Sequence, residues 1–248
     1  WFSSGLWTFS TLGWPEKTRE LKRYYPWDFE ITAPEIKYLW IARMIMLGLW
    51  FKNEIPFKNM FFHGMLRDLQ GRRFSKSLGN GIDPNELREQ WGTDATRMAL
   101  YTYSIPGRDG RTSRQIMDER CKNYRNFETK IRNIYRYIYE LKPEKVASKS
   151  KFTHPEDKKI TKQLNTTINY VIKHFERFEL HLAVDKIYNF IWHGFADIYI
   201  EQSKKRREET QPCLEYVFES SLKLLHPFMP FITEEIYQKL GGEGSLMV

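Results

Sequence analysis

Residues 61–84 read Phe-Phe-His-Gly-Met-Leu-Arg-Asp-Leu-Gln-Gly-Arg-Arg-Phe-Ser-Lys-Ser-Leu-Gly-Asn-Gly-Ile-Asp-Pro. The apolar run that starts at Met60 predicts a buried strand, and the polar turn 68–71 reverses the chain. Cations and hydroxyls at 73–77 are followed by glycines at 79 and 81. A loop of this kind can move and can bring backbone N–H groups close to an anion. The stretch therefore predicts a strand that leads into a mobile cationic loop.

Lys76 is flanked by Ser75 and Ser77, so the loop offers a cation and hydroxyl donors on a flexible tether. Phosphoryl chemistry needs such groups where negative charge builds up. Asp83 follows as an N-cap, with a proline at the first helical position, which predicts a helix over 84–101. Composition alone also allows a solvated basic turn, and that alternative stays open at this point.

The residues before the loop predict a strand, a helix and a second strand. Residues 28–32 alternate polar and apolar as a strand does, and apolar residues at helical spacing predict a helix over 34–51. With the strand at 60–64 they form the repeating unit of a parallel sheet. Ligands bind such sheets at the carboxyl ends of the strands, where we expect the loop 71–81 to lie. Residues 19–26 are expected to form a polar connection.

The segment Ser-Ile-Pro-Gly-Arg-Asp-Gly at 104–110 breaks the helix that precedes it and is the expected domain boundary. After it we find no strand pattern. Helical periodicity predicts helices over 112–141, 156–178, 181–204, 211–226 and 230–240. The fold class is therefore α/β followed by all-α, with domains at 1–104 and 105–248.

Composition narrows the class of protein. The 248 residues are 41% hydrophobic and carry a net charge of +8, which fits a globular protein with a polyanionic partner. The longest apolar run, 38–51, contains Arg43 and is too short to span a bilayer. Cys121 and Cys213 lie in no metal-binding pattern. We expect no metal site, a reducing compartment and a cytoplasmic location.

Positive charge is concentrated in the helix predicted over 112–141. Residues 105–142 hold ten Lys or Arg against five Asp or Glu. Cations interleaved with tyrosines and Phe127 suit RNA, because phosphates bind the cations and bases stack on rings. A solvated face beside a core is the alternative reading. Four cations share a stripe beside the apolar face: Lys122, Arg125, Arg132 and Arg136.

Residues 73–80 resemble the second signature of class I aminoacyl-tRNA synthetases, Lys-Met-Ser-Lys-Ser, which is followed by Gly-Asn and an Asp-Pro helix start. Arg73 replaces the first lysine and Phe74 replaces the methionine, so the positive charge survives. The likeness to the valyl-tRNA synthetase family extends over the whole chain. Its further segments are 1–7, 9–15, 40–46, 63–64, 106–109, 124–127 and 225–231.

The resemblance implies a fold and a reaction. Residues 1–104 would be the second half of a nucleotide-binding, Rossmann-like domain, and residues 105–248 a helical-bundle anticodon-binding domain. The reaction would be that of a valine–tRNA ligase, with valine, ATP, Mg²⁺ accompanying the ATP, and tRNA-Val as partners. We expect a monomer without a structural metal.

The resemblance also assigns residues to sites. Trp1 and Trp40 match the tryptophans of the family's amino-acid pocket. Glu35 stands where the family has an aspartate in a Gly-x-Asp segment, and it is expected to contact the ribose. The catalytic set is Lys76, Arg73, Ser75 and Ser77. The ATP-binding set is Lys76, Glu35, His63 and Gly64. The tRNA-binding set is Arg108, Lys122, Arg125, Phe127, Arg132 and Arg136.

Two alternatives remain. The His-Ile-Gly-His signature that binds ATP in this family does not occur in the sequence, nor does an editing domain, so a non-catalytic tRNA- or RNA-binding module is possible. A relative of isoleucyl- or leucyl-tRNA synthetases is the other. The sequence starts with Trp1, and we expect it to be part of a longer chain that it needs in order to charge tRNA and to proofread.

Overall fold

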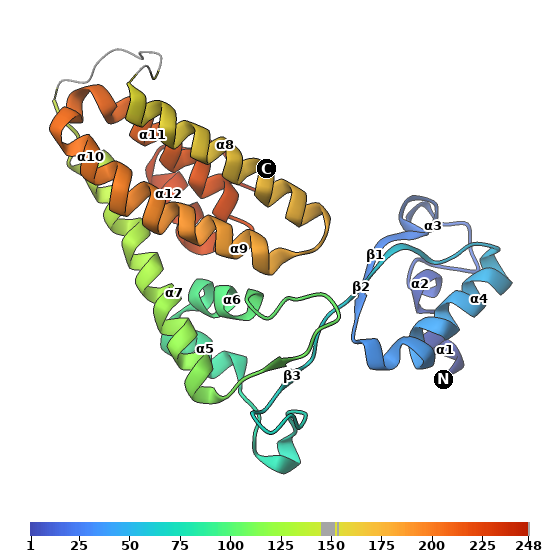
Figure 1. Ribbon diagram of the computed structural model, residues 1–248. Coiled ribbons are helices and arrows are strands. Elements are labelled where there is room, and N and C mark those ends of the chain that lie inside the picture. The colour runs from blue at the N-terminus through green and yellow to red at the C-terminus, as the bar shows by residue number, and fades with distance from the viewer. Residues whose placement is uncertain (145–151, 153, 248) are drawn as a thin grey trace. The chain divides into compact units, whose positions relative to one another are not determined.

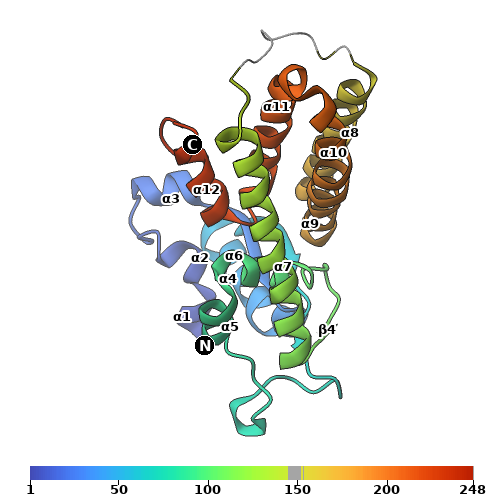
Figure 2. The same ribbon diagram turned by 90° about the vertical axis from the view of Figure 1, so that its left-hand side faces the viewer.

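The structure is a computed structural model that describes residues 1–144, 152 and 154–247, with Lys76 described by its backbone alone (Figures 1 and 2). The chain forms two compact units. The first holds residues 1–67 and 105–110, and the second holds residues 68–104 and 111–248. Each unit has buried apolar clusters of its own.

A pair of parallel strands organises the first unit. β1 (Trp27–Thr32) pairs with β2 (Phe57–Phe62), and α4 (Ala42–Lys52) connects them. This arrangement confirms the predicted strand–helix–strand unit. The N–H of Gly110 donates to the Met65 carbonyl at 3.0 Å, where two short strands meet. The remaining elements are α1 (Phe2–Gly5), α2 (Trp7–Ser10), α3 (Arg19–Tyr24), β3 (Leu66–Arg67) and β4 (Gly110–Arg111).

Two details of this unit differ from prediction. The helix expected over 34–51 starts with a 3-10 turn (Pro34–Ile36) and a π-helical turn (Lys37–Ile41) before α4 begins. Where a polar connection was expected, α3 forms instead. The Thr18 hydroxyl accepts the N–H of Leu21 at 3.0 Å, and Leu21 is buried. One N-cap and one apolar anchor are therefore enough to hold this short helix.

Over residues 29–32 of β1 the apolar side chains are exposed and the polar side chains are buried, the reverse of the usual pattern. Phe29 and Ile31 are 38% and 56% exposed, whereas Glu30 and Thr32 are buried. Burial raises the pKa of the Glu30 carboxyl. Parallel strands normally have apolar side chains covered on both faces. In the part of the chain that the structure describes, β1 instead directs two large apolar side chains toward solvent.

The second unit begins with two helices that pack on a third. α5 (Pro84–Trp91) and α6 (Thr93–Tyr101) both contact α7 (Arg114–Tyr135), as Figure 1 shows. One helix was predicted over 84–101, and this prediction is wrong because Gly92, at a φ of +91°, separates the two. Glycine adopts this conformation without a steric penalty, so it ends one helix and starts the next.

The rest of the second unit is a helical bundle, which confirms the all-α prediction. α7 continues as a π-helical turn (Arg136–Glu140), and α9 continues as a longer π-helical segment (Phe190–Ile200). The other elements are α8 (Pro155–Glu176), α9 (Leu180–Asn189), α10 (Glu201–Ser203), a 3-10 turn (Lys204–Arg206), α11 (Arg207–Leu225) and α12 (Pro230–Lys239).

A buried carboxylate joins α6 to α12. Asp94 accepts the N–H of Ile232 at 2.7 Å and the N–H of Phe231 at 3.3 Å. Burial raises the pKa of this carboxyl, although the two hydrogen bonds oppose the shift. Asp94 thus caps the start of α12 from another helix, since these N–H groups have no partner within α12 itself.

The contacts group residues 68–104 with the bundle, because α5 and α6 pack on α7. The boundary expected at 104–105 lies where the chain passes from the second unit to the first. The expected domain ranges differ from the two units, and they stay a prediction. The expected position of the loop 71–81 beside the strand ends also stays a prediction, since the loop and β1 belong to different units.

Candidate functional site

One amide side chain closes the cationic loop. Asn80 Oδ1 accepts the Ser75 N–H at 2.9 Å, and Asn80 Nδ2 donates to the Arg73 carbonyl at 3.1 Å. The same Nδ2 donates to Asp68 Oδ2 at 3.0 Å. Asn80 therefore ties the cationic segment 73–77 to the start of the loop.

Asp68 is the acceptor at the other end of this clamp. It is 6% exposed, its Oδ1 accepts the Arg72 N–H at 2.8 Å, and its Oδ2 accepts Arg72 Nε at 2.7 Å. Burial raises the pKa of this carboxyl, but hydrogen bonds from Asn80 and Arg72 outweigh burial and lower the pKa to about 2. A pKa that falls on folding stabilises the fold above the unfolded value of 3.8, and this contribution is lost as the pH falls through about 2. The clamp is therefore intact at neutral pH.

Lys76 begins a 3-10 turn, Lys76–Leu78, beside two hydroxyls. Ser75 Oγ lies 2.6 Å from Ser77 Oγ and accepts the Ser77 N–H at 3.2 Å. Gly79 follows at a φ of +61°. The side chain of Lys76 lies outside the described atoms, so its role stays a prediction. The Asn80 clamp holds the backbone that precedes Lys76, at Arg73 and Ser75.

If the loop acts as its resemblance to the synthetase signature implies, we predict that Asn80→Ala lowers the rate of valine-dependent pyrophosphate exchange about tenfold in a complete ligase that contains this chain. The substitution removes three hydrogen bonds that order the loop, each with a net contribution of about 1 kcal/mol, and only part of that loss reaches the reacting geometry. Asn85→Ala is the matched control, because Asn85 is exposed on α5 and its side chain forms no described hydrogen bond. Equal rates in the two variants would rule out the clamp as a positioning device.

His63 and Gly64 follow β2 at its carboxyl end. The His63 N–H donates to the Thr32 carbonyl at 3.0 Å, so the turn continues the pairing of the two strands. A Cβ at Gly64 would overlap the carbonyl group of Arg108 and would lie 3.1 Å from the Asp109 nitrogen. Gly64 is therefore needed for the close approach of the segment 106–109, in addition to its predicted place in ATP binding.

Arg67 forms ion pairs with two carboxylates of the first unit, Glu35 and Asp109. Arg67 Nη2 lies 3.1 Å from Glu35 Oε1, and Arg67 Nε lies 2.5 Å from Asp109 Oδ2. The hydrogen bond to Asp109 is the main cause of the raised pKa of the Arg67 guanidinium. Asp109 Oδ1 also accepts the Met65 N–H at 2.9 Å. Glu35 thus has a protein partner beside the strand ends, and its predicted contact with a ribose stays a prediction.

Trp1 and Trp40 are anchored by neighbouring turns of the first unit. Trp40 Nε1 donates to the Ser4 carbonyl at 2.9 Å, and Arg43 Nη1 donates to the Trp1 carbonyl at 3.0 Å. The Arg43 guanidinium also lies 4.7 Å from the centroid of the Trp1 ring. Trp1 is 76% exposed. Both residues are thus tied to neighbouring turns of the first unit, and their place in an amino-acid pocket stays a prediction.

The cationic stripe of α7 is largely paired with carboxylates. Arg125 Nη1 lies 2.6 Å from Glu128 Oε2, and Arg132 Nη2 lies 3.2 Å from Glu128 Oε1. Arg132 Nη1 also lies 2.7 Å from Glu235 Oε1 on α12. Arg136 Nε lies 3.3 Å from Glu140 Oε2. Since Glu128 is 6% exposed, Arg132 first serves the packing of α7 on α12.

Phe127 cannot act as predicted. Its side chain is 0% exposed and its ring packs against Tyr188, with centroids 4.8 Å apart, and against Trp192. A buried core ring has no face to offer to a base, so its assignment to RNA binding is wrong. Lys122 is exposed, and among the described residues no carboxylate pairs with it.

We predict that Arg132→Ala lowers the free energy of unfolding by about 2 kcal/mol. It leaves the buried Glu128 without one of its two cations, and partial exposure of the arginine reduces the cost below that of a fully buried pair. Lys122→Ala, the matched control on the same helix, changes stability by less than about 0.5 kcal/mol. Urea unfolding would contradict this assignment if both variants were as stable as the parent.

Comparison with known proteins connects these features. Residues 1–113 match the family model "tRNA synthetases class I (I, L, M and V)", and residues 157–248 match "Anticodon-binding domain of tRNA ligase". The chain belongs to the class I aminoacyl-tRNA synthetases. The valine–tRNA ligase of Thermotoga maritima is 44% identical over 99% of this chain, and that of Clostridium tetani is 45% identical over 98%. In both cases the chain spans 28% of the relative's length.

Solved synthetase structures share the fold. A leucyl-tRNA synthetase from Agrobacterium radiobacter K84, in a ternary complex, matches this chain with a TM-score of 0.78 at 19% identity. The match covers 98% of this chain and 32% of the leucyl-tRNA synthetase chain. A Mycobacterium tuberculosis methionyl-tRNA synthetase with methionyl-adenylate matches it with a TM-score of 0.77 at 22% identity. The match covers 94% of this chain and 48% of the methionyl-tRNA synthetase chain. The expected class I fold and the resemblance to the valine family are thus confirmed.

In this synthetase chain, sequence patterns did not assign Asp68, Asn80 and Asp109 a positioning role. The spacing of Asp68 and Arg72 across a turn was the available signal, because aspartate often accepts nearby backbone N–H groups. The contact between Asp68 and Asn80 joins residues twelve positions apart, and that between Asp109 and Arg67 joins residues forty-two apart. Neither separation follows a helix or strand period.

The two thiols of the synthetase chain take no part in these sites. Cys121 and Cys213 are buried and free, and burial raises the pKa of both, to about 11 for Cys213. A protonated thiol is a poor nucleophile, so neither is a catalytic candidate.

Among the described residues, no three His, Cys, Asp or Glu side chains are grouped to hold a metal ion. No described helix has the length and apolar character needed to cross a membrane.

Proposed function

We propose that this chain supplies the signature loop and the tRNA-binding helices of a valine–tRNA ligase. In the proposed reaction the carboxylate of valine attacks the α-phosphate of ATP, which enters with Mg²⁺, and pyrophosphate leaves. The valyl group then passes to the terminal ribose of tRNA-Val. The observation that carries the proposal is 44% identity to the Thermotoga maritima valine–tRNA ligase across 99% of the chain.

In this proposal the loop acts on the leaving pyrophosphate. Lys76 places a cation where negative charge develops, Arg73 adds a second, and the hydroxyls of Ser75 and Ser77 donate hydrogen bonds. A donor aimed at developing charge lowers a barrier by about 3 kcal/mol. The Asn80 clamp supports this role, since it orders the backbone that leads into Lys76.

The first unit would bind the nucleotide and the amino acid. His63 and Gly64 stand at the carboxyl end of β2, where parallel sheets bind ligands, and Glu35 is proposed for the ribose. Trp1 and Trp40 are proposed as apolar walls for the small branched side chain of valine. The exposed apolar side chains of β1 support the proposal that this unit is part of a larger sheet domain.

The tRNA contacts are proposed for the exposed cations. Arg108, Lys122 and Arg125 are exposed and remain in this set. Arg136 is also exposed, with an ion pair to Glu140 that water screens. Arg132 is proposed to act mainly through packing. The proposal also includes a monomeric state and a cytoplasmic location. The buried free thiols support the location, because a reducing compartment preserves them.

The test is pyrophosphate exchange by a complete ligase that contains this chain, with valine, isoleucine and leucine assayed in parallel. We expect exchange that depends on valine, with the other two at least about tenfold weaker, since one methylene in an apolar pocket changes binding by about 1–3 kcal/mol. Exchange driven best by isoleucine or leucine would assign the chain to another member of the class. No exchange with any of the three would leave RNA binding without catalysis.

A further inference from the structure

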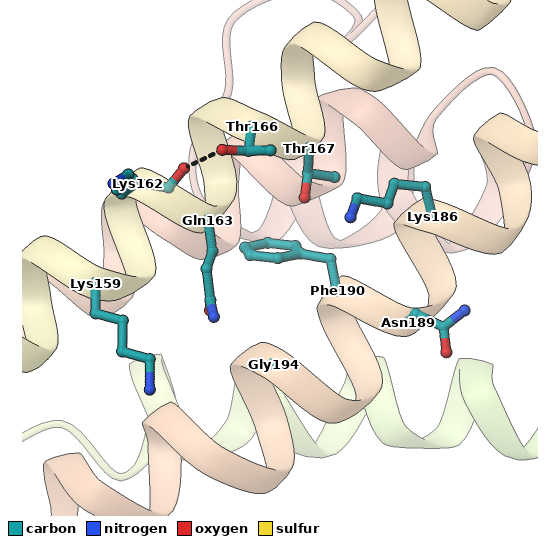
Figure 3. A pocket seen from close by; sticks show the side chains of 9 residues that line it. All are labelled: Lys159, Lys162, Gln163, Thr166, Thr167, Lys186, Asn189, Phe190 and Gly194. Carbon is teal, nitrogen blue, oxygen red and sulfur yellow. Dashed lines mark hydrogen bonds between the residues drawn. The ribbon is translucent and has the colours of Figure 1, made fainter.

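A pocket in the helical bundle lies apart from every residue assigned above. It has a volume of about 360 Å³ and lies between α8 and the helix formed by α9 and the π-helical segment that follows (Figure 3). Lysines enter it from both helices. We name it the lysine pocket, and its main lining residues are Lys159, Lys162, Gln163, Thr167, Lys186 and Phe190.

The cations of the lysine pocket are not neutralised. None of Lys159, Lys162 and Lys186 forms an ion pair with a described residue, and no carboxylate lines the pocket. The Lys186 ammonium lies over the Tyr170 ring, 5.6 Å from its centroid. Three lysines around one cavity repel one another, so the arrangement favours an anion between them.

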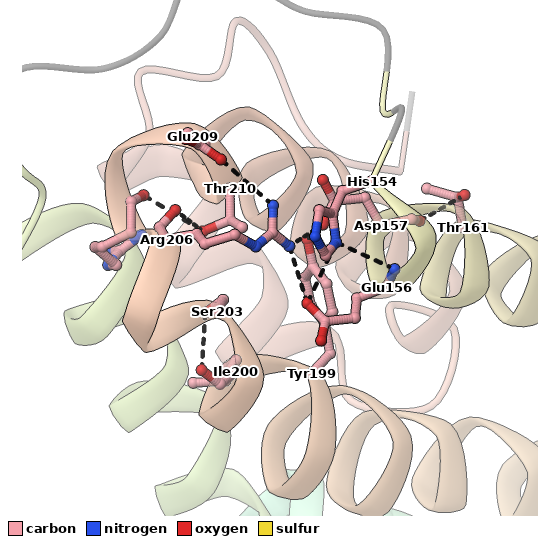
Figure 4. Close-up of polar contacts among 11 residues, drawn as sticks. His154, Glu156, Asp157, Thr161, Tyr199, Ile200, Ser203, Arg206, Glu209 and Thr210 are labelled. Carbon is pink, nitrogen blue, oxygen red and sulfur yellow. Dashed lines mark hydrogen bonds and ion pairs between the residues drawn. The ribbon is translucent and has the colours of Figure 1, made fainter.

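The nearest carboxylates on α8 are engaged elsewhere. Glu156 Oε2 lies 3.0 Å from Arg206 Nη2, and Asp157 Oδ1 lies 3.1 Å from the same nitrogen (Figure 4). Tyr199 also donates its hydroxyl to Asp157 Oδ1 at 2.8 Å. The two acids that precede Lys159 are therefore held in ion pairs with Arg206, and neither lines the pocket.

Two neutral polar side chains of the pocket, one buried and one exposed, also lack described partners. Thr167 is 2% exposed, and its hydroxyl forms no hydrogen bond with any described residue. Figure 3 shows this hydroxyl directed into the cavity, above the ring of Phe190. The Gln163 amide projects into the same space and likewise has no described partner. The Thr167 hydroxyl still reaches solvent in the cavity, so it is available to donate to a ligand there.

We propose that the lysine pocket binds a phosphate group of an RNA backbone. Unpaired ammonium groups bind phosphate oxygens, and the Thr167 hydroxyl and Gln163 amide supply further donors in the same pocket. An RNA strand is favoured over a free nucleotide because Lys159 and Lys162 are exposed at the rim, so a strand can cross the pocket. The proposal rests on the proposed function, which makes tRNA the partner of this unit, and it adds a contact surface away from α7.

Charge removal is the first test. In the complete ligase, Lys159→Gln with Lys186→Gln is expected to weaken binding of a tRNA-Val transcript roughly tenfold and to lower the slope of log K against log salt by about 1. Lys158→Gln with Lys173→Gln is the matched control. Both control lysines are exposed on α8 and outside the pocket, so the same change in net charge should weaken binding by less than about twofold.

Filling the pocket is the second test, and it leaves the charge unchanged. A Cβ at Gly194 would lie 3.7 Å from Gln163 Oε1 and 3.7 Å from Phe190, which are ordinary contacts. Gly194→Ala is therefore expected to bind the transcript as the parent does. Gly194→Leu extends into the cavity and is expected to weaken binding roughly tenfold, because it displaces the phosphate from its donors.

The outcomes separate this proposal from the proposed function. If the Lys159/Lys186 variant binds the transcript with the affinity and salt slope of its control, the lysine pocket is not an RNA site. If that variant loses only the binding of inorganic phosphate, followed by chemical shifts of the Gln163 amide, a free anion is the ligand and the proposal is wrong. Valine-dependent exchange by the unaltered ligase tests the proposed function independently of either result.

Discussion

Lys76→Ala lowers the rate of valine-dependent pyrophosphate exchange by about 100- to 1,000-fold and leaves the Kd for tRNA unchanged. The expected loss corresponds to about 3 kcal/mol of stabilisation that one donor gives to developing negative charge. The tRNA affinity is unaffected because the ammonium is proposed to act on the pyrophosphate. The measurements are ATP–pyrophosphate exchange and filter binding of the tRNA by the complete ligase.

Two further substitutions make this expectation specific. Lys76→Arg keeps the charge but changes its geometry, so it should recover part of the lost rate. Arg88→Ala removes an exposed cation from α5, whose guanidinium lies 3.8 Å from Glu89, and should leave exchange unchanged. A Lys76→Ala enzyme that exchanges at the parent rate would show that the loop acts through its backbone alone.

Local patterns predicted the elements of the fold well where the determining contacts are close in sequence. Alternation and helical spacing indicated the parallel unit of β1, α4 and β2, and the structure confirms it. The same patterns missed the break at Gly92, because the residues on both sides share one helical periodicity. They also missed α3, whose apolar anchor is the single residue Leu21.

The cationic loop was predictable because its signature is local in sequence. The predictions for α7 were less accurate because its contacts come from distant segments. The order of residues in the loop 73–80 identifies the signature directly. On α7 the helical wheel placed the cations on one stripe, but the partner of Arg132 comes from Glu235, 103 residues away. Phe127 belongs to the apolar face of the same helix, and its aromatic character alone suggested RNA binding.

Contacts between distant segments also hid the lysine pocket and the environment of Gly64. Lys159 and Lys186 belong to two helices, and no spacing in the sequence indicates that their side chains share a cavity. Gly64 reads in sequence as part of a His-Gly pair. Its steric requirement becomes visible only when the carbonyl group of Arg108 is placed against it.

That requirement leads to a second large effect. We expect Gly64→Ala to lower the free energy of unfolding of the first unit by about 3 kcal/mol, because a methyl group would overlap the backbone of Arg108 and force the segment 106–109 away from the end of β2. The hydrogen bonds of Asp109 to Met65 and Arg67 would then be strained or lost. Denaturant unfolding followed by tryptophan fluorescence reports on this unit, since it holds six of the eight tryptophans.

Gly81→Ala distinguishes a steric cause from a general effect of replacing glycine. No described atom lies within 4 Å of the position of a Cβ at Gly81, and its φ is not in the left-handed region, so the substitution should change stability by less than about 0.5 kcal/mol. Gly64→Ala should also abolish most of the pyrophosphate exchange, since the displaced segment carries the partner of Arg67 and, through it, of Glu35. If Gly64→Ala unfolds like the parent while exchange is lost, Gly64 acts in ATP binding itself. If both properties are retained, the close approach of Arg108 is not required for the fold.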